Sequence, residues 1–230
     1  IEYNRTLKRA SESKAIPLTA SALKQMKSAK QPKFNDPHLG LQWHMVNNSD
    51  LGETKFIAGA DVNVEAAWEY CTGNPSVIVA VLDEGVDFSH PDLRGSMWVN
   101  ENEIWRSTED NDGNGYAGDR YGYNFVKDSP VICWSENYDT GHGTHVAGTI
   151  AAVNNNGIGV CGIAGGDAAK GQKGVRIMPL QIFDDSRTST LDLEAKAFKY
   201  AADNGVVIMQ CSWGYNSAYA NEVQGYMPGP

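Results

Sequence analysis

Residues 77–82 read Val-Ile-Val-Ala-Val-Leu and are followed directly by Asp83. The run is apolar and does not alternate with polar residues, which is typical of a parallel strand buried on both faces of a sheet. Residues 175–183 and 206–211 are further strand candidates. Three such segments predict an α/β domain with a central parallel sheet.

Helical patterns occur between and before these strands. Small residues dominate 143–153, and apolar residues recur at helical spacing over 189–204. A shorter helix is predicted near 64–70. Ser189 followed by Asp192 resembles a capping box, which predicts the start of the second helix. Strand, helix and strand in this order predict a βαβ crossover.

The composition bounds the possible functions. The chain has 230 residues, 41% of them hydrophobic, and a net charge of −9. This suffices for one domain with a sizeable core, and the acidic surface argues against nucleic-acid binding. No apolar run is long enough to span a bilayer. Residues 1–33 nevertheless carry eight basic and only two acidic side chains, so we expect a separate unit there and a domain boundary at Phe34.

Functional residues of an open parallel sheet gather beyond the carboxyl ends of its strands. Asp83 follows the first predicted strand and Ser212 follows the last. Between them, His142 falls at the start of a predicted helix, where the helix dipole favours a neutral imidazole. An Asp that orients such a His forms two thirds of a nucleophile-activating triad.

Two stretches now resemble a known family. Residues 79–93 read Val-Ala-Val-Leu-Asp-Glu-Gly-Val-Asp-Phe-Ser-His-Pro-Asp-Leu, and residues 141–149 read Gly-His-Gly-Thr-His-Val-Ala-Gly-Thr. Both resemble the Asp and His signatures of the subtilisin-like serine proteases, the subtilases. The likeness implies a three-layer α/β fold with helices on both faces of the sheet. Glu84 departs from the pattern, because the family usually has Ser or Thr there to support the carboxylate.

The resemblance implies a role for several residues. Asp83 would orient the imidazole, and His142 would be the general base and then the general acid. Ser212, Trp213 and Gly214 look like the strand that binds an extended substrate peptide, with residues 186–188 as the opposite wall. The family's oxyanion Asn and nucleophilic Ser would lie beyond Pro230, so we expect residues 1–230 alone to be inactive as a protease.

A calcium site is predicted from the residues themselves. Residues 110–115 read Asp-Asn-Asp-Gly-Asn-Gly, which fits the oxygen-rich D-x-[DN]-x-[DN]-G calcium pattern. The alternative is a solvated acidic turn. The candidate ligands are Asp110, Asp112, Asn114, the backbone oxygen of Tyr116, and Asp119.

The family resemblance alone implies further partners. Asp36, Asp92 and Asn155 match a second calcium site of many subtilases. Residues 1–33 are similar to the end of a propeptide or to a linker, and 34–230 to the N-terminal part of a catalytic domain. A secreted protein is therefore expected, with a peptide or protein substrate, its own propeptide and the remaining part of the catalytic domain as partners.

Two alternatives stay open at this point. One is a non-catalytic relative of the subtilases that binds peptides or calcium. The other is a nucleotide-binding α/β protein, which the acidic composition and the lack of a complete phosphate-binding loop disfavour.

Overall fold

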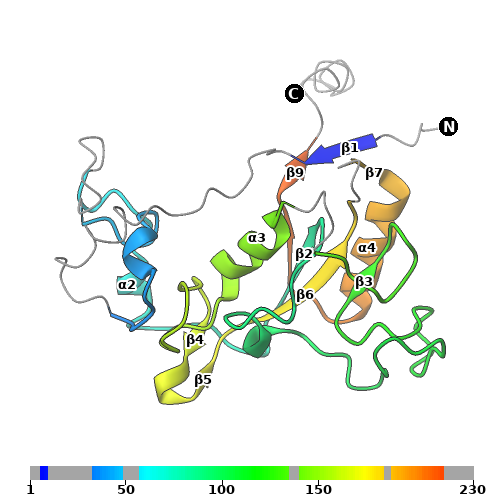
Figure 1. Ribbon diagram of the computed structural model, residues 1–230, viewed down its shortest axis with the longest axis horizontal. Coiled ribbons are helices and arrows are strands. Elements are labelled where there is room, and N and C mark those ends of the chain that lie inside the picture. Colours follow the sequence, from blue (N-terminus) through cyan, green and yellow to red (C-terminus); the bar gives the residue numbers. More distant parts are fainter. Residues whose placement is uncertain (1–5, 10–32, 49–56, 135–139, 184–187, 215–230) are drawn as a thin grey trace, which may run out of the picture.

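A four-stranded parallel sheet forms the centre of the computed structural model, which describes residues 6–9, 33–48, 57–134, 140–183 and 188–214 (Figure 1). The strand order is β3-β6-β2-β8, and every neighbouring pair is parallel. All three predicted strands are present. The strands span Ile78–Asp83 (β2), Tyr123–Asn124 (β3), Arg176–Gln181 (β6) and Ile208–Cys211 (β8).

The central strand β2 is buried along its whole length. Its side chains alternate between two apolar cores: Val79 and Val81 belong to one, and Ala80 and Leu82 to the other. This alternation follows from the period of two along a strand. It explains why the β2 sequence shows no polar face.

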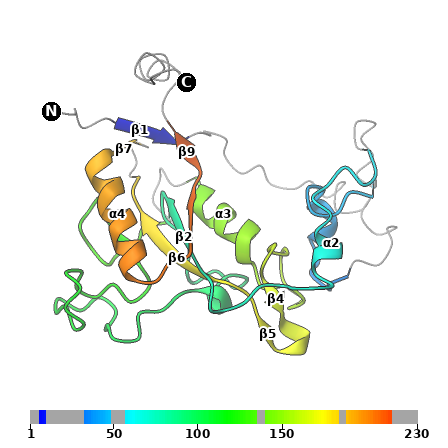
Figure 2. The same ribbon diagram turned by 180° about the vertical axis from the view of Figure 1, so that it is seen from behind.

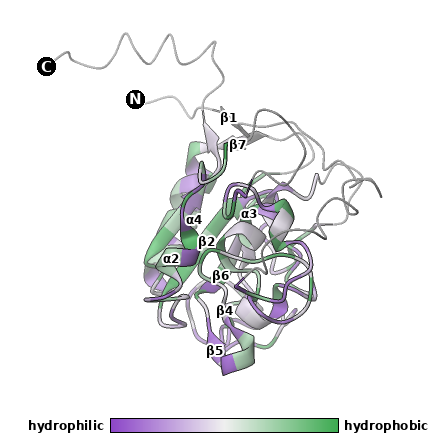
Figure 3. Ribbon diagram, turned by 90° about the vertical axis from the view of Figure 1, so that its left-hand side faces the viewer, coloured by the Kyte–Doolittle hydropathy of each residue, from purple (hydrophilic) through white to green (hydrophobic). Residues whose placement is uncertain are grey.

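One long helix covers each face of the sheet. Helix α3 (His142–Ala151) places Ala147 and Ala151 against the core that contains Val79. Helix α4 (Leu191–Asp203) places Ala197 and Tyr200 against the opposite core. In Figure 3 the hydrophobic colour is concentrated where the strands pass between these helices. The predicted α/β class, with helices on both faces, is confirmed.

A second, antiparallel sheet lies where the chain leaves β8. Its order is β7-β1-β9, formed by Thr188–Thr190 (β7), Thr6–Arg9 (β1) and Trp213–Gly214 (β9). The middle strand comes from the N-terminal end of the chain, and Figures 1 and 2 both show it across the end of β9. The N-terminal segment thus adds a strand between two segments of the folded domain.

Of the remaining elements, α2 lies on the far side of the molecule from α4 (Figure 2). Helix α2 begins as predicted but is a single turn, and Val64 and Trp68 pack there with Phe34. The short elements are α2 (Val64–Ala67), β4 (Gly166–Asp167), β5 (Gln172–Lys173) and the 3-10 turns Leu39–Leu41, Arg94–Ser96 and Ala168–Lys170.

The predicted capping box is wrong. Helix α4 begins at Leu191, its N-cap is Thr190, and no side chain of the N-cap bonds the helix backbone. Ser189 belongs to β7, paired with Leu7 of β1. The Thr190 hydroxyl donates instead to Asp192 Oδ1 at 2.6 Å. Strand pairing in β7 therefore overrides the local capping preference.

Gly143 offers a sharp test of how closely α3 packs on the sheet. A Cβ there would lie 2.1 Å from the Gly85 carbonyl oxygen, whereas a Cβ at Gly148 of the same helix would meet nothing within 4 Å. We expect Gly143→Ala to lower the free energy of unfolding by about 3 kcal/mol. Gly148→Ala should raise it by up to about 1 kcal/mol, as alanine does in helices. Urea unfolding of both variants measures this, and equal effects would contradict the packing described.

Candidate functional site

Asp83 and His142 meet at the carboxyl end of β2. Asp83 is the last residue of β2, and His142 is the first residue of α3. The His142 Nδ1 atom lies 2.9 Å from both carboxylate oxygens of Asp83. With its Nδ1 proton directed at the carboxylate, the imidazole has Nε2 as the atom that takes up a further proton. The two residues that the motifs single out are therefore hydrogen-bonded.

Asp83 is fixed by the sheet as well as by His142. Its side chain is only 1% exposed, and its Oδ1 accepts the Glu84 N–H at 2.8 Å. Its backbone oxygen accepts the Ile182 N–H at 2.9 Å from the segment after β6. A buried carboxylate needs such partners, because leaving it unpaired would cost several kcal/mol.

The predicted substrate strand lies beside this pair. The Trp213 indole N–H donates to the Leu82 carbonyl oxygen at 3.0 Å, and its ring packs edge-on against Phe183 at 6.1 Å. Ser212 Oγ accepts from Gln210 Nε2 at 3.0 Å. Trp213 is thus anchored to the core and also forms part of the strand β9.

Strand β1 fills the place between β9 and β7. Lys8 lies opposite both Gly214 of β9 and Thr188 of β7, and Arg9 lies opposite Trp213. Thr188 is the described member of the predicted opposite wall; residues 186 and 187 lie outside the described part of the chain. Thr188 from one predicted wall, and Trp213 and Gly214 from the other, therefore pair with one extended segment.

The direction of β1 leads toward the Asp83–His142 pair. Leu82 is level with Cys211 across β2 and β8, so the next step along both strands brings Asp83 level with Ser212. Strand β1 runs antiparallel to β9, from Gly214 toward Trp213. An extended peptide in this register therefore advances toward the imidazole.

Two of the candidate calcium ligands, Asp112 and Asp119, lie in a cluster of carboxylates. Glu103, Asp112 and Asp119 place carboxylate oxygens within 4.8 Å of one another. Asp119 is fully buried, and its burial raises the pKa of its carboxyl group. The Asn114 amide donates to Asp119 Oδ2 at 2.9 Å, and the Tyr200 hydroxyl donates to the same atom at 2.6 Å.

Asp110 accepts hydrogen bonds within the loop, and the ring of Tyr116, whose backbone oxygen is the candidate ligand, packs on α4. The Asp110 carboxylate accepts the N–H groups of Gly113, Asn114 and Gly115, and these bonds lower its pKa, that from Gly115 most. The Tyr116 ring packs edge-on against Tyr200 at 4.9 Å. Asp110 therefore stabilises the turn of its own loop, whereas Asp112 and Asp119 belong to the cluster of carboxylates with Glu103.

Sequence reasoning missed Glu103. It precedes the calcium-like motif by seven residues and fits no position of that pattern. Its side chain is 1% exposed, and it accepts the N–H groups of Asn111 at 2.5 Å, Asp112 at 3.0 Å and Gly118 at 3.0 Å. The feature that identifies Glu103 is its burial, which is rare for a Glu side chain and which only the structure reveals.

The second predicted calcium set gathers around the loop after α3. Asp36 Oδ2 accepts the Asn155 N–H at 2.7 Å, and Asp92 Oδ2 accepts the Val160 N–H at 2.9 Å. Burial raises the pKa of Asp92, and the charge of Asp36 adds to this effect. The Asn155 amide donates to Asp167, and the amide that reaches Asp92 belongs to Asn156.

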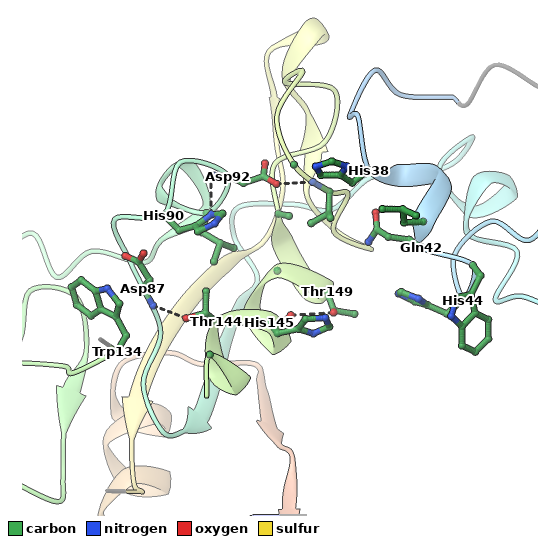
Figure 4. Close-up of a pocket in the computed structure, with 18 residues that line it drawn as sticks. His38, Gln42, His44, Asp87, His90, Asp92, Trp134, Thr144, His145 and Thr149 are labelled. Carbon is green, nitrogen blue, oxygen red and sulfur yellow. Dashed lines mark hydrogen bonds between the residues drawn. The ribbon is translucent and has the colours of Figure 1, made fainter. Parts of the chain in front are cut away.

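A cavity of about 860 Å³ lies along the outer side of α3, as Figure 4 shows. Four of the chain's five histidines line it: His38, His44, His90 and His145. Burial lowers the pKa of His44, and the nearby His145 lowers it further. His145 is exposed and faces this cavity. His142 is not among the lining residues.

Comparisons with known proteins agree with the motifs. "Subtilisin-like protease 1" of Plasmodium vivax is 41% identical over 142 residues, which is 60% of this chain and 20% of that protein. The Plasmodium berghei protein of the same name is 31% identical over 196 residues, 84% of this chain and 28% of the relative. The chain thus spans less than a third of the length of these relatives.

Solved structures give a weaker likeness. Fervidolysin from Fervidobacterium pennivorans matches with a TM-score of 0.45 and 24% identity, covering 92% of this chain and 26% of that one. The serine protease of Aeromonas sobria matches with a TM-score of 0.44 and 27% identity, covering 74% and 24%. With TM-scores below 0.5, these likenesses carry no part of the assignment.

A match to a family model establishes which family the chain belongs to. The model described as the Subtilase family matches residues 74–228. This span includes the Asp83–His142 pair and β9, and it is well over half of the chain. The chain therefore belongs to the subtilase family.

Proposed function

We propose that this chain is the N-terminal part of the catalytic domain of a serine endopeptidase. The observation that carries the proposal is the bond between His142 Nδ1 and the buried Asp83 carboxylate. The nucleophilic Ser and the oxyanion Asn would be supplied by sequence beyond Pro230. The competing reading is a non-catalytic relative that binds peptides or calcium.

The geometry of the pair suits acyl transfer. Asp83 holds the Nδ1 proton, so His142 Nε2 takes the proton of the attacking hydroxyl and the imidazolium is stabilised by the carboxylate. The same proton then goes to the leaving amine as the peptide bond breaks. Water attacks the resulting acyl-enzyme, with His142 again as the base.

Labelling with a fluorophosphonate tests this proposal. Residues 1–230 should give no adduct in intact-mass spectrometry, and the longer natural polypeptide should give one. His142→Ala should abolish labelling of the longer protein, since loss of a triad member costs on the order of 10⁶ in turnover. His145→Ala, three residues along the same helix, should label normally. A longer protein that folds but takes no label would favour the non-catalytic reading.

Substrate binding is proposed to occur by addition of a strand between β7 and β9. The chain's own Thr6–Arg9 segment occupies this position, which supports the first part of residues 1–33 as the end of a propeptide and the rest of that stretch as a linker. Main-chain hydrogen bonds supply the affinity in this mode, and side-chain pockets supply selectivity. By the register of β1, cleavage of this segment would fall in the few residues after Arg9 rather than at the compositional boundary near Phe34.

A competition experiment checks the groove. A chain that lacks residues 1–9 should bind the peptide Thr-Leu-Lys-Arg, and the complete chain should bind it at least tenfold more weakly. The matched peptide with proline in place of Leu and Lys should not bind, because proline has no N–H to donate. Fluorescence anisotropy measures all three. Equal binding by both chains would place the peptide elsewhere.

Calcium is the proposed cofactor, held by Glu103, Asp112 and Asp119. Three carboxylates within 4.8 Å repel one another, and oxygen donors at this spacing suit a hard cation. The ion would brace the loop that packs on Tyr200 of α4. Asp36 and Asp92 are the proposed carboxylates of a second site.

Calcium should raise the melting temperature of the chain, and EDTA should reverse the increase. Glu103→Gln removes a charge from the acidic cluster and should reduce this shift, leaving the part that the proposed second site contributes. Glu109→Gln alters an exposed carboxylate nearby in the same region and should leave the shift unchanged. Differential scanning calorimetry with and without calcium makes the comparison; an undiminished shift in the Glu103 variant would remove Glu103 from the site.

The protein is also proposed to be secreted. The similar proteins named halolysin and fervidolysin motivate this proposal. Among the described residues, no helix has the length and apolar character needed to cross a membrane.

A further inference from the structure

Glu84, the residue directly after Asp83, is buried at the start of α3. Its side chain is 6% exposed. Its Oε1 atom accepts the Thr140 N–H at 3.1 Å, the Thr140 hydroxyl at 2.8 Å and the His142 N–H at 2.8 Å. A carboxylate in this position therefore binds the chain on both sides of Gly141.

Helix α3 lacks the usual means of capping its own N-terminus. Its N-cap is Gly141, which has no side chain and a φ of +74°, and no acidic residue stands in its first turn. The first N–H groups of a helix need external acceptors. Glu84 supplies one from a different element, and its negative charge lies at the positive end of the helix dipole.

Two adjacent carboxylates thus hold the same histidine at different atoms. Asp83 bonds the ring at Nδ1, and Glu84 bonds the backbone N–H. Because the direction of a side chain follows from its backbone, a shift of the first turn of α3 would move the ring away from Asp83. The close contact of Gly143 with the Gly85 carbonyl oxygen shows how little room this turn has.

We propose that Glu84 is a positioning residue for His142: it caps α3 from the neighbouring turn and places a second negative charge beside the imidazole. This role rests on the proposed function only in naming His142 as the general base. It accounts for the departure from Ser or Thr at this position, because a carboxylate can reach the start of the helix and offset the helix dipole, which disfavours the imidazolium.

The charge of Glu84 has a measurable consequence on His142. A nearby carboxylate favours the imidazolium, so Glu84 should raise the pKa of His142. Asp83 on β2 bonds the ring, His145 follows three residues along α3, and Cys211 on β8 interacts electrostatically with Asp83. Burial raises the pKa of the Cys211 thiol to about 11, with Glu194 and Asp83 contributing, so this thiol is neutral near pH 7. Among the residues that the structure describes, Asp83 and Glu84 are the carboxylates that hydrogen-bond His142.

An NMR titration of the histidine rings in residues 1–230 tests the role without any protease assay. Glu84→Gln keeps an acceptor oxygen and removes the charge, so the pKa of His142 should fall by about 0.5–1 unit while its Nδ1–H signal persists. Glu84→Ala removes the cap as well, so that signal should weaken or vanish. The control Glu109→Gln should change neither the pKa of His142 nor its Nδ1–H signal.

The outcomes separate this role from a merely structural one. A normal His142 titration and a normal Nδ1–H signal in both Glu84 variants would overturn the proposal. If Glu84→Ala fails to fold, Glu84→Gln and Glu84→Ser still decide it, since Gln should restore the ring contact better than Ser. Failure of the longer protein to label with fluorophosphonate would refute the protease proposal and leave this result standing.

Discussion

The site depends on the close approach between the first turn of α3 and the turn that follows β2. A side chain at Gly143 would collide with the Gly85 carbonyl oxygen at 2.1 Å, so this contact is between backbones. It brings Asp83 within 2.9 Å of a histidine 59 residues away in the sequence. The same approach lets Glu84 reach the His142 N–H. One packing contact therefore sets two of the interactions that define the site.

The sheet holds the buried Asp83 carboxylate in a fixed position, which limits the energetic cost of burying it. Burying the Asp83 carboxylate removes it from water, and only fixed hydrogen-bond partners can compensate. The central position of β2, between β6 and β8, fixes the Asp83 backbone, so its carboxylate meets partners already in place. Preorganised charge of this kind is what stabilises a developing imidazolium.

The sequence predicts the parts of this arrangement that have a period or a motif. The apolar run before Asp83 predicts a buried strand, and the motif around His142 predicts the helix that carries the base. Glu84 and Glu103 act through contacts between separate segments, which no local pattern encodes. The capping box at Ser189 failed for the same reason, because pairing of β7 with Leu7 of β1 decides the conformation there.

The basic N-terminal stretch of this otherwise acidic chain contributes strand β1. A basic N-terminal segment lies along β9 in an otherwise acidic protein. Long-range attraction of this kind speeds encounter and weakens with salt, whereas ladder hydrogen bonds are short-ranged and largely independent of side chains. Charge attraction and backbone hydrogen bonds therefore affect binding in different ways. Under the proposed function, charge would favour the chain's own segment over other peptides, and the backbone ladder would leave the groove able to accept many sequences after release of that segment.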